Sequence, residues 1–128
     1  MAATLPFKLI TPSDVVFDGE AELVIAVTTE GEEGILPRHA PLLAALRPGV
    51  LRANVRKDGN AERLERATGA GFIQALPDRV TVLVDEALAF EEVDVAKARQ
   101  ELAEARRSAD RLAEEFAAAK LRLTGHQP

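Results

Sequence analysis

The first two thirds of the chain alternate short apolar runs with polar turn residues. Two of the runs, 23–27 and 80–84, are rich in β-branched residues and are too short for helices. Glycine, proline, asparagine and aspartate interrupt the sequence at intervals of roughly 8 to 12 residues, as at 58–60. From Leu5 to Ala87 this rhythm predicts an antiparallel β-sandwich.

After residue 87 the pattern becomes that of a helix. The segment 91–123 contains no glycine or proline, and alanine, glutamate, arginine and leucine dominate it. Acidic residues at its start and basic residues at its end complement the helix dipole. We therefore expect two units, a β-sandwich at residues 1–88 and a helical unit at residues 89–128.

Apolar residues of the helical unit recur at alternating spacings of three and four, which predicts an unbroken heptad seam. Much of this seam is alanine, which buries little apolar surface, so the segment should dock onto something else. The pattern fits one straight helix. It also fits a hairpin folded near Ser108 to Asp110, because serine and aspartate form local hydrogen bonds to the backbone that favour a turn. The seam consists of Val95, Ala98, Leu102, Ala105, Ala109, Leu112, Phe116, Ala119 and Leu123.

Composition narrows the range of partners. The net charge of −5 argues against nucleic acid, whose binders need a basic face, so protein partners are expected. The absence of cysteine excludes disulfides and thiolate chemistry. No apolar run approaches the roughly 20 residues of a membrane-spanning helix, so we expect any membrane association to be made through other proteins.

Residues for catalysis are scarce. The only serines are Ser13 and Ser108, and the only histidines are His39 and His126, which makes a catalytic triad or a zinc site a poor interpretation. The chain has no phosphate-binding glycine loop, and we interpret 69–71 (Gly-Ala-Gly) as a bulge or the entry to a strand. The sequence predicts no catalytic site, no metal and no cofactor.

The most specific feature is the stretch 30–43, Glu-Gly-Glu-Glu-Gly-Ile-Leu-Pro-Arg-His-Ala-Pro-Leu-Leu. It closely resembles the signature of the epsilon subunits of bacterial-type ATP synthases, and the resemblance extends over essentially the whole chain. It implies a sandwich of about ten strands bound to the gamma subunit and the c ring of the rotor, followed by C-terminal helices. It also implies a non-catalytic peripheral protein on the cytoplasmic face of the bacterial inner membrane, within a proton-translocating ATP synthase.

The resemblance assigns contacts to this stretch. Glu32 matches the position that faces the c ring, and the loop with His39, Pro41 and Leu42 matches the gamma contact. The alternative for His39 is a hydrogen bond to the backbone of its own loop. The family usually has glycine at the position of Arg38. Two prolines and a glycine should fix this connection, and we expect Ile35, Leu36, Leu42 and Leu43 to pack it against the sandwich.

The resemblance also implies that the helical unit is regulatory. It implies that the helices either fold against the sandwich or extend along gamma to the catalytic beta and alpha subunits, where they inhibit ATP hydrolysis. Their basic residues would then meet an acidic segment of beta; the alternative is that they are solvated. These residues are Arg99, Arg106, Arg107, Arg111, Lys120 and Arg122.

Asp94 and Lys97 resemble part of a motif with which some family members bind ATP. The family has arginine where this chain has Lys97, and lysine lacks the planar grip of a guanidinium, so any ATP binding should be weak. The alternative to ATP binding is that the motif only marks the start of a helix. Two alternatives to the rotor subunit remain: an ATP-sensing binding module, and an unrelated adaptor built from a sandwich and a coiled coil.

Overall fold

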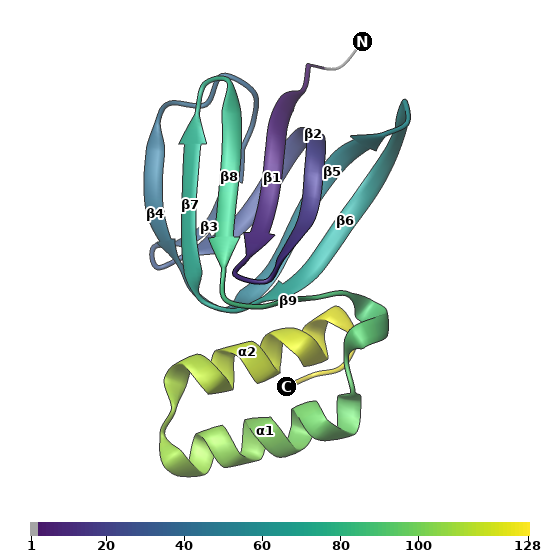
Figure 1. Ribbon diagram of the computed structural model, residues 1–128. Coiled ribbons are helices and arrows are strands. Elements are labelled where there is room, and N and C mark those ends of the chain that lie inside the picture. The colour runs from purple at the N-terminus through teal and green to yellow at the C-terminus, as the bar shows by residue number, and fades with distance from the viewer. Residues whose placement is uncertain (1–2) are drawn as a thin grey trace.

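The computed structural model describes residues 3–128 as a β-sandwich followed by a helical hairpin (Figure 1). The strands come first along the chain and the helices last. Over the described residues there are nine strands, where about ten were expected. The elements are β1 (Leu5–Thr11), β2 (Asp14–Thr28), β3 (Gly31–Ile35), β4 (Leu42–Leu46), β5 (Gly49–Lys57), β6 (Asn60–Thr68), β7 (Gly71–Leu76), β8 (Arg79–Val84), β9 (Ala87–Leu88), the 3-10 turn η1 (Phe90–Glu92), α1 (Val95–Ser108) and α2 (Arg111–Leu123).

The long strand β2 joins the two layers of the sandwich. Its first part pairs with β1, and its second part pairs with β5 and β3. One layer therefore runs β4-β7-β8-β1-β2, and the other contains β3, β2, β5, β6 and β9. The β1–β8 pair is parallel, so the antiparallel prediction is wrong for this pair. Local hydrophobic patterns carry no information about the direction of strands that are far apart in sequence.

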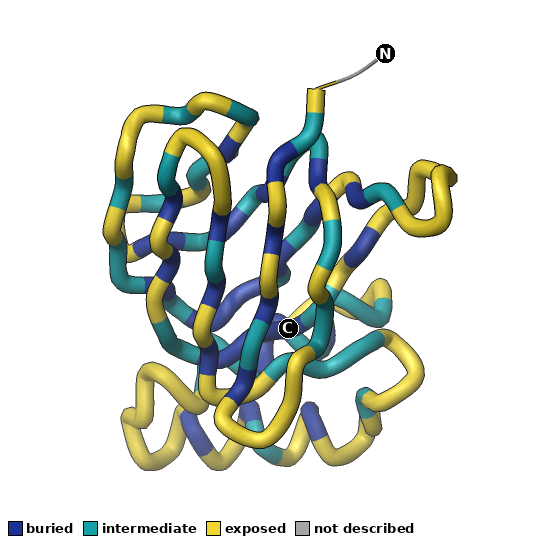
Figure 2. The backbone as a smooth tube through the Cα atoms, turned by 45° about the horizontal axis from the view of Figure 1, so that its top comes forward, coloured by how far each residue is buried: buried dark blue, intermediate teal, exposed yellow. Residues whose placement is uncertain are grey.

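Buried and exposed residues alternate along the strands (Figure 2). In β1 the buried positions are Leu5, Phe7 and Leu9, as a period of two requires. The rings of Phe7 and Phe17 pack with their centroids 5.5 Å apart. The core is a single cluster within the sandwich, and it also contains Val24, Ile35, Leu46, Leu51, Ala53, Val55, Leu64, Ile73, Val80, Val82 and Val84.

The helical unit is a hairpin, the second of the two alternatives that the sequence allows. Ala109 adopts the left-handed conformation, with φ 56°, and ends α1. The Oδ1 atom of Asp110 accepts a hydrogen bond from the Ala113 amide at 3.1 Å and caps α2, while the Ser108 hydroxyl donates to the Glu104 carbonyl at 3.0 Å. The prediction of an unbroken heptad seam is therefore wrong, because Ala109 and Leu112 are exposed at the turn.

In the hairpin, α2 lies between the sandwich and α1 (Figure 1). It packs against β5 and β6. The hairpin has its own apolar cluster, separate from the core of the sandwich. This cluster contains Val95, Ala98, Leu102, Ala117, Ala118 and Leu121.

Candidate interaction surfaces

An apolar row crosses the outer face of the β4-β7-β8-β1-β2 layer. The register places Phe72 of β7 beside Ala45 of β4 on one side and Leu83 of β8 on the other. Leu83 in turn lies beside Ile10, and Ile10 beside Val15. Phe72 is 59% exposed and Leu83 is 49% exposed. A contiguous exposed apolar surface of this kind is typical of a protein interface. We call these five residues the apolar row.

The apolar row was not predicted from the sequence, because an outward apolar residue such as Leu83 stands between buried valines in its strand. Leu43, on the same face of β4, is 74% exposed, and Leu36 is 57% exposed. The prediction that these two leucines pack the signature loop against the sandwich is wrong. Ile35 is buried and Leu42 packs against the core, as predicted, so the loop is held by these two residues.

The signature loop between β3 and β4 is shaped by local hydrogen bonds. Arg38 adopts a left-handed backbone conformation with φ 67°, which glycine adopts without steric cost. Its amide donates to the Pro77 carbonyl at 3.1 Å. The Nδ1 atom of His39 lies 2.6 Å from the Ala40 carbonyl oxygen, and its Nε2 atom lies 3.5 Å from the Glu33 carboxylate. This geometry fits the backbone-bonding alternative for His39, while Pro41 is exposed.

Glu32 lies on β3 near the hairpin end of the sandwich, with its side chain 59% exposed. Its carboxylate accepts a hydrogen bond from Arg52 at 2.9 Å. Both residues line a groove of about 790 Å³ between the sandwich and α2. Arginines from both units also line it, which brings Glu32 close to the basic residues of the hairpin.

The six basic residues predicted for the helical unit do not form one free face in the hairpin. Lys120 has its side chain only 11% exposed, bonded to Glu101 at 2.6 Å and stacked 4.6 Å above the Phe116 ring. Arg106 pairs with Glu114 at 3.3 Å. All five arginines of this set are exposed. Arg107 pairs with Glu104, and Arg99 donates to the Gln127 carbonyl. Arg111 and Arg122 line the groove of Glu32.

Asp94 and Lys97 act together at the start of α1. The Oδ1 atom of Asp94 accepts a hydrogen bond from the Lys97 amide at 3.1 Å, which is the geometry of an N-cap. This fits the interpretation of the motif as a helix start. ATP binding stays a prediction, which equilibrium dialysis would test.

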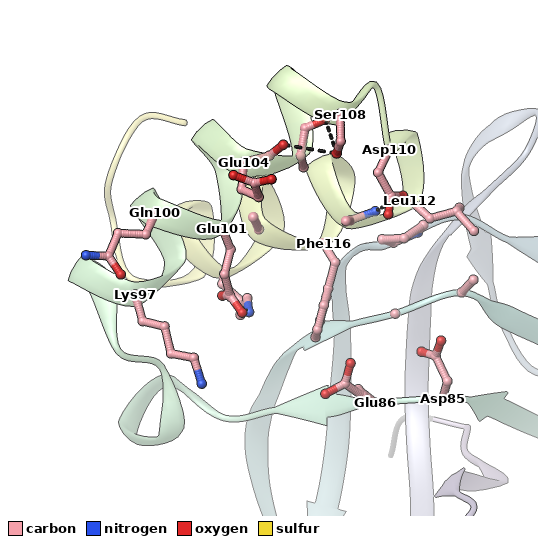
Figure 3. Close-up of a pocket in the computed structure, with 17 residues that line it drawn as sticks. Asp85, Glu86, Lys97, Gln100, Glu101, Glu104, Ser108, Asp110, Leu112 and Phe116 are labelled. Atoms are coloured by element: carbon pink, nitrogen blue, oxygen red, sulfur yellow. Dashed lines mark hydrogen bonds and ion pairs between the residues drawn. The ribbon is translucent and has the colours of Figure 1, made fainter.

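The Lys97 side chain lines a second groove, of about 630 Å³, between the hairpin and the ends of β7 and β8. Figure 3 shows Asp85 and Glu86 on the strand side of this groove, with Phe116 reaching between the two units. Five carboxylates and two lysines line it. The carboxylates belong to Asp85, Glu86, Glu101, Glu104 and Asp110, and the lysines are Lys97 and Lys120. Such a surface repels a triphosphate more than it attracts one.

Two negative findings apply to the described residues 3–128. These residues hold no group of three or more histidine, cysteine, aspartate or glutamate side chains that could bind a metal. They also form no helix that is long and apolar enough to cross a membrane.

Residues 4–90 match the model of the family described as "ATP synthase, Delta/Epsilon chain, beta-sandwich domain". The chain is 40% identical over 103 residues to the ATP synthase epsilon chain of Chromobacterium violaceum, covering 80% of this chain and 69% of that one. It is 41% identical over 106 residues to that of Alkalihalophilus pseudofirmus, covering 81% and 77%. The chain belongs to the ATP synthase epsilon chain family.

Solved structures agree with this fold. A chain of the mitochondrial ATP synthase of Euglena gracilis superimposes with a TM-score of 0.72 at 24% identity, covering 95% of this chain and 78% of that one. A chain from the central stalk and c ring of the Tetrahymena thermophila enzyme gives 0.60 at 20% identity, covering 90% and 97%. At these identities the likeness concerns the fold alone.

Proposed function

We propose that this epsilon chain is a subunit of the central stalk of ATP synthase, where it couples rotation of gamma and the c ring to ATP synthesis. The observation that carries this proposal is the family match over the sandwich. Relatives that share about two fifths of its residues are ATP synthase epsilon chains. The role is structural and regulatory rather than catalytic.

The apolar row is the surface that we assign to gamma. Phe72 and Leu83 lie at its centre on the outer face of the sheet, and Leu43 extends it toward the signature loop. Aromatic and aliphatic side chains at the centre of a patch contribute most of the binding energy of an interface. His39, Pro41 and Leu42 remain part of the proposed gamma contact at the edge of this face.

Glu32 is the proposed contact with the c ring. A carboxylate at the rim of an interface contributes more to orientation than to affinity, since exposed ion pairs yield about 0 to 1 kcal/mol. The chain would reach the membrane only through these subunits, on its cytoplasmic face.

The hairpin is the proposed inhibitor of ATP hydrolysis. Its apolar cluster is separate from the core of the sandwich, so its departure would leave that core intact. Extension along gamma would free Arg106 and Lys120 from Glu114 and Glu101 and make them available to an acidic segment of the catalytic subunits.

Substitution of the central aromatic residue tests the gamma surface. Phe72→Glu should lower the affinity for a gamma-containing complex by at least about tenfold, because it places a charge in the middle of the apolar row. Surface plasmon resonance with the immobilised complex would measure this. Asn54→Glu is the matched control, since it adds the same charge on β5, in the other layer. Equal affinity of the Phe72→Glu variant and the parent chain would contradict the assignment of this face.

A further inference from the structure

One ion pair joins the sandwich to the hairpin among the described residues. Arg47 lies in the turn between β4 and β5, where its amide donates to the Val27 carbonyl at 3.0 Å. Its Nε atom donates to the Glu115 Oε2 atom of α2 at 2.7 Å, and its Nη2 atom donates to the same oxygen. The Glu115 side chain is 18% exposed and that of Arg47 is 43% exposed. We call this contact the sandwich–hairpin ion pair.

Two fully buried alanines lie on the facing elements β6 and α2. Ala67 of β6 follows the exposed Arg63 and Glu65 on the outer face of the sheet, yet it is fully buried. Since α2 packs against β5 and β6, we place Ala67 under the hairpin, with Leu88 of β9 beside it in the sheet. Ala119 of α2 is also fully buried and belongs to neither apolar cluster. Alanine contacts remove little surface from water, although the larger Phe116 also reaches between the two units (Figure 3), so we expect the ion pair to add to this apolar contact in holding the units together.

Neighbouring charges strengthen this arrangement. Glu114, next to Glu115, pairs with Arg106 of α1 at 3.3 Å. Two successive carboxylates of α2 thus bind one arginine from each neighbouring element. Arg111 and Arg122, which make no ion pair among the described residues, line the same groove and keep it positive around Glu115.

We infer that the sandwich–hairpin ion pair is the element that sets the equilibrium between a docked and an undocked hairpin. Undocking breaks this pair and uncovers Ala67, while the pairs within the hairpin can persist. Salt screens the attraction and favours undocking. One consequence rests on the proposed function: if the hairpin inhibits ATP hydrolysis, the ion pair controls how readily the hairpin becomes available for that inhibition.

A single thiol reports the equilibrium, because the chain contains no cysteine of its own. In an Ala67→Cys background, the rate of reaction with an uncharged aromatic disulfide measures how often the hairpin leaves β6. Arg47→Glu and Glu115→Arg should each raise this rate on the order of tenfold, since each places like charges together. The double variant Arg47→Glu/Glu115→Arg should restore a rate close to that of the background. Molar salt should raise the rate of the background.

Two controls separate undocking from other effects. Arg107→Glu breaks the pair of Arg107 with Glu104, which lies within α1, and should leave the rate within about twofold because exposed pairs of this kind are weak. A thiol at Val82, in the core of the sandwich, should stay unreactive in every variant unless the sandwich itself unfolds. Unchanged rates in both single variants, or a double variant that reacts as fast as they do, would overturn the inference. These measurements use the isolated chain, so the binding test of the gamma surface stands or fails separately.

Discussion

Gly71 shows how closely two strands approach at one residue. A Cβ atom added at Gly71 would lie 2.0 Å from the Leu83 carbonyl oxygen, a backbone atom that cannot rotate away. The same end of β7 is fixed by hydrogen bonds from Gly69 to Glu86 and from Asp85 to Ala70. The sequence interpretation of 69–71 as the entry to a strand is confirmed by this geometry, and the backbone contact explains why glycine stands there.

Gly71→Ala should lower the free energy of unfolding by about 1 to 3 kcal/mol, because the methyl group forces β7 away from β8. Chemical denaturation followed by circular dichroism would measure the change. Gly34→Ala is a suitable comparison, since its added Cβ would meet only the Leu23 side chain at 3.7 Å. A loss at position 71 no greater than that at position 34 would refute the close approach.

At the scale of the elements, the turn of the helical hairpin is stabilised by the N-cap of α2. The hairpin turn was visible in the sequence as the polar residues Ser108 and Asp110, but the seam of Ala109 and Leu112 continued through it. Alanine and leucine tolerate both a buried seam and an exposed turn, so the pattern alone left two alternatives. The hydrogen bond from the Ala113 amide to the Asp110 carboxylate stabilises the turn in the structure.

Asp110→Ala should destabilise α2 by about 0.5 to 2 kcal/mol, because the Ala113 amide then loses its partner. The loss should appear as an earlier decrease in helical circular dichroism on heating. Asp110→Asn keeps a capping oxygen and should change the transition much less. If alanine and asparagine behave alike, the cap does not stabilise the turn.

The predicted strands show what alternation can and cannot reveal. In β1 apolar and other residues alternate, and the structure buries Leu5, Phe7 and Leu9. In β8 the run Val-Thr-Val-Leu-Val is apolar at nearly every position, so Leu83 resembled the core valines on either side of it. A stricter count would have flagged Leu83, because a residue between two inward valines must point outward.

On the scale of the whole molecule, the two units have separate apolar clusters, and the ion pair between Arg47 and Glu115 joins them. The sequence predicted a sandwich and a helical unit that docks, but a period of two or of 3.6 says nothing about which strands face the helices. Arg47 and Glu115 are 68 residues apart in the chain, so their pairing needed the fold. The proposed function requires the sandwich to stay bound while the hairpin moves, and the separate clusters are consistent with that proposal.

ATP hydrolysis by a reconstituted complex of alpha, beta and gamma tests whether the hairpin is the inhibitory part of the chain. It should be assayed with the full chain and with a chain that ends after Ala89. Both chains should bind, because the sandwich core does not include the hairpin, and only the full chain should suppress hydrolysis. Equal suppression by both would contradict the regulatory role of the hairpin, and failure of both to bind would contradict the assignment to the rotor.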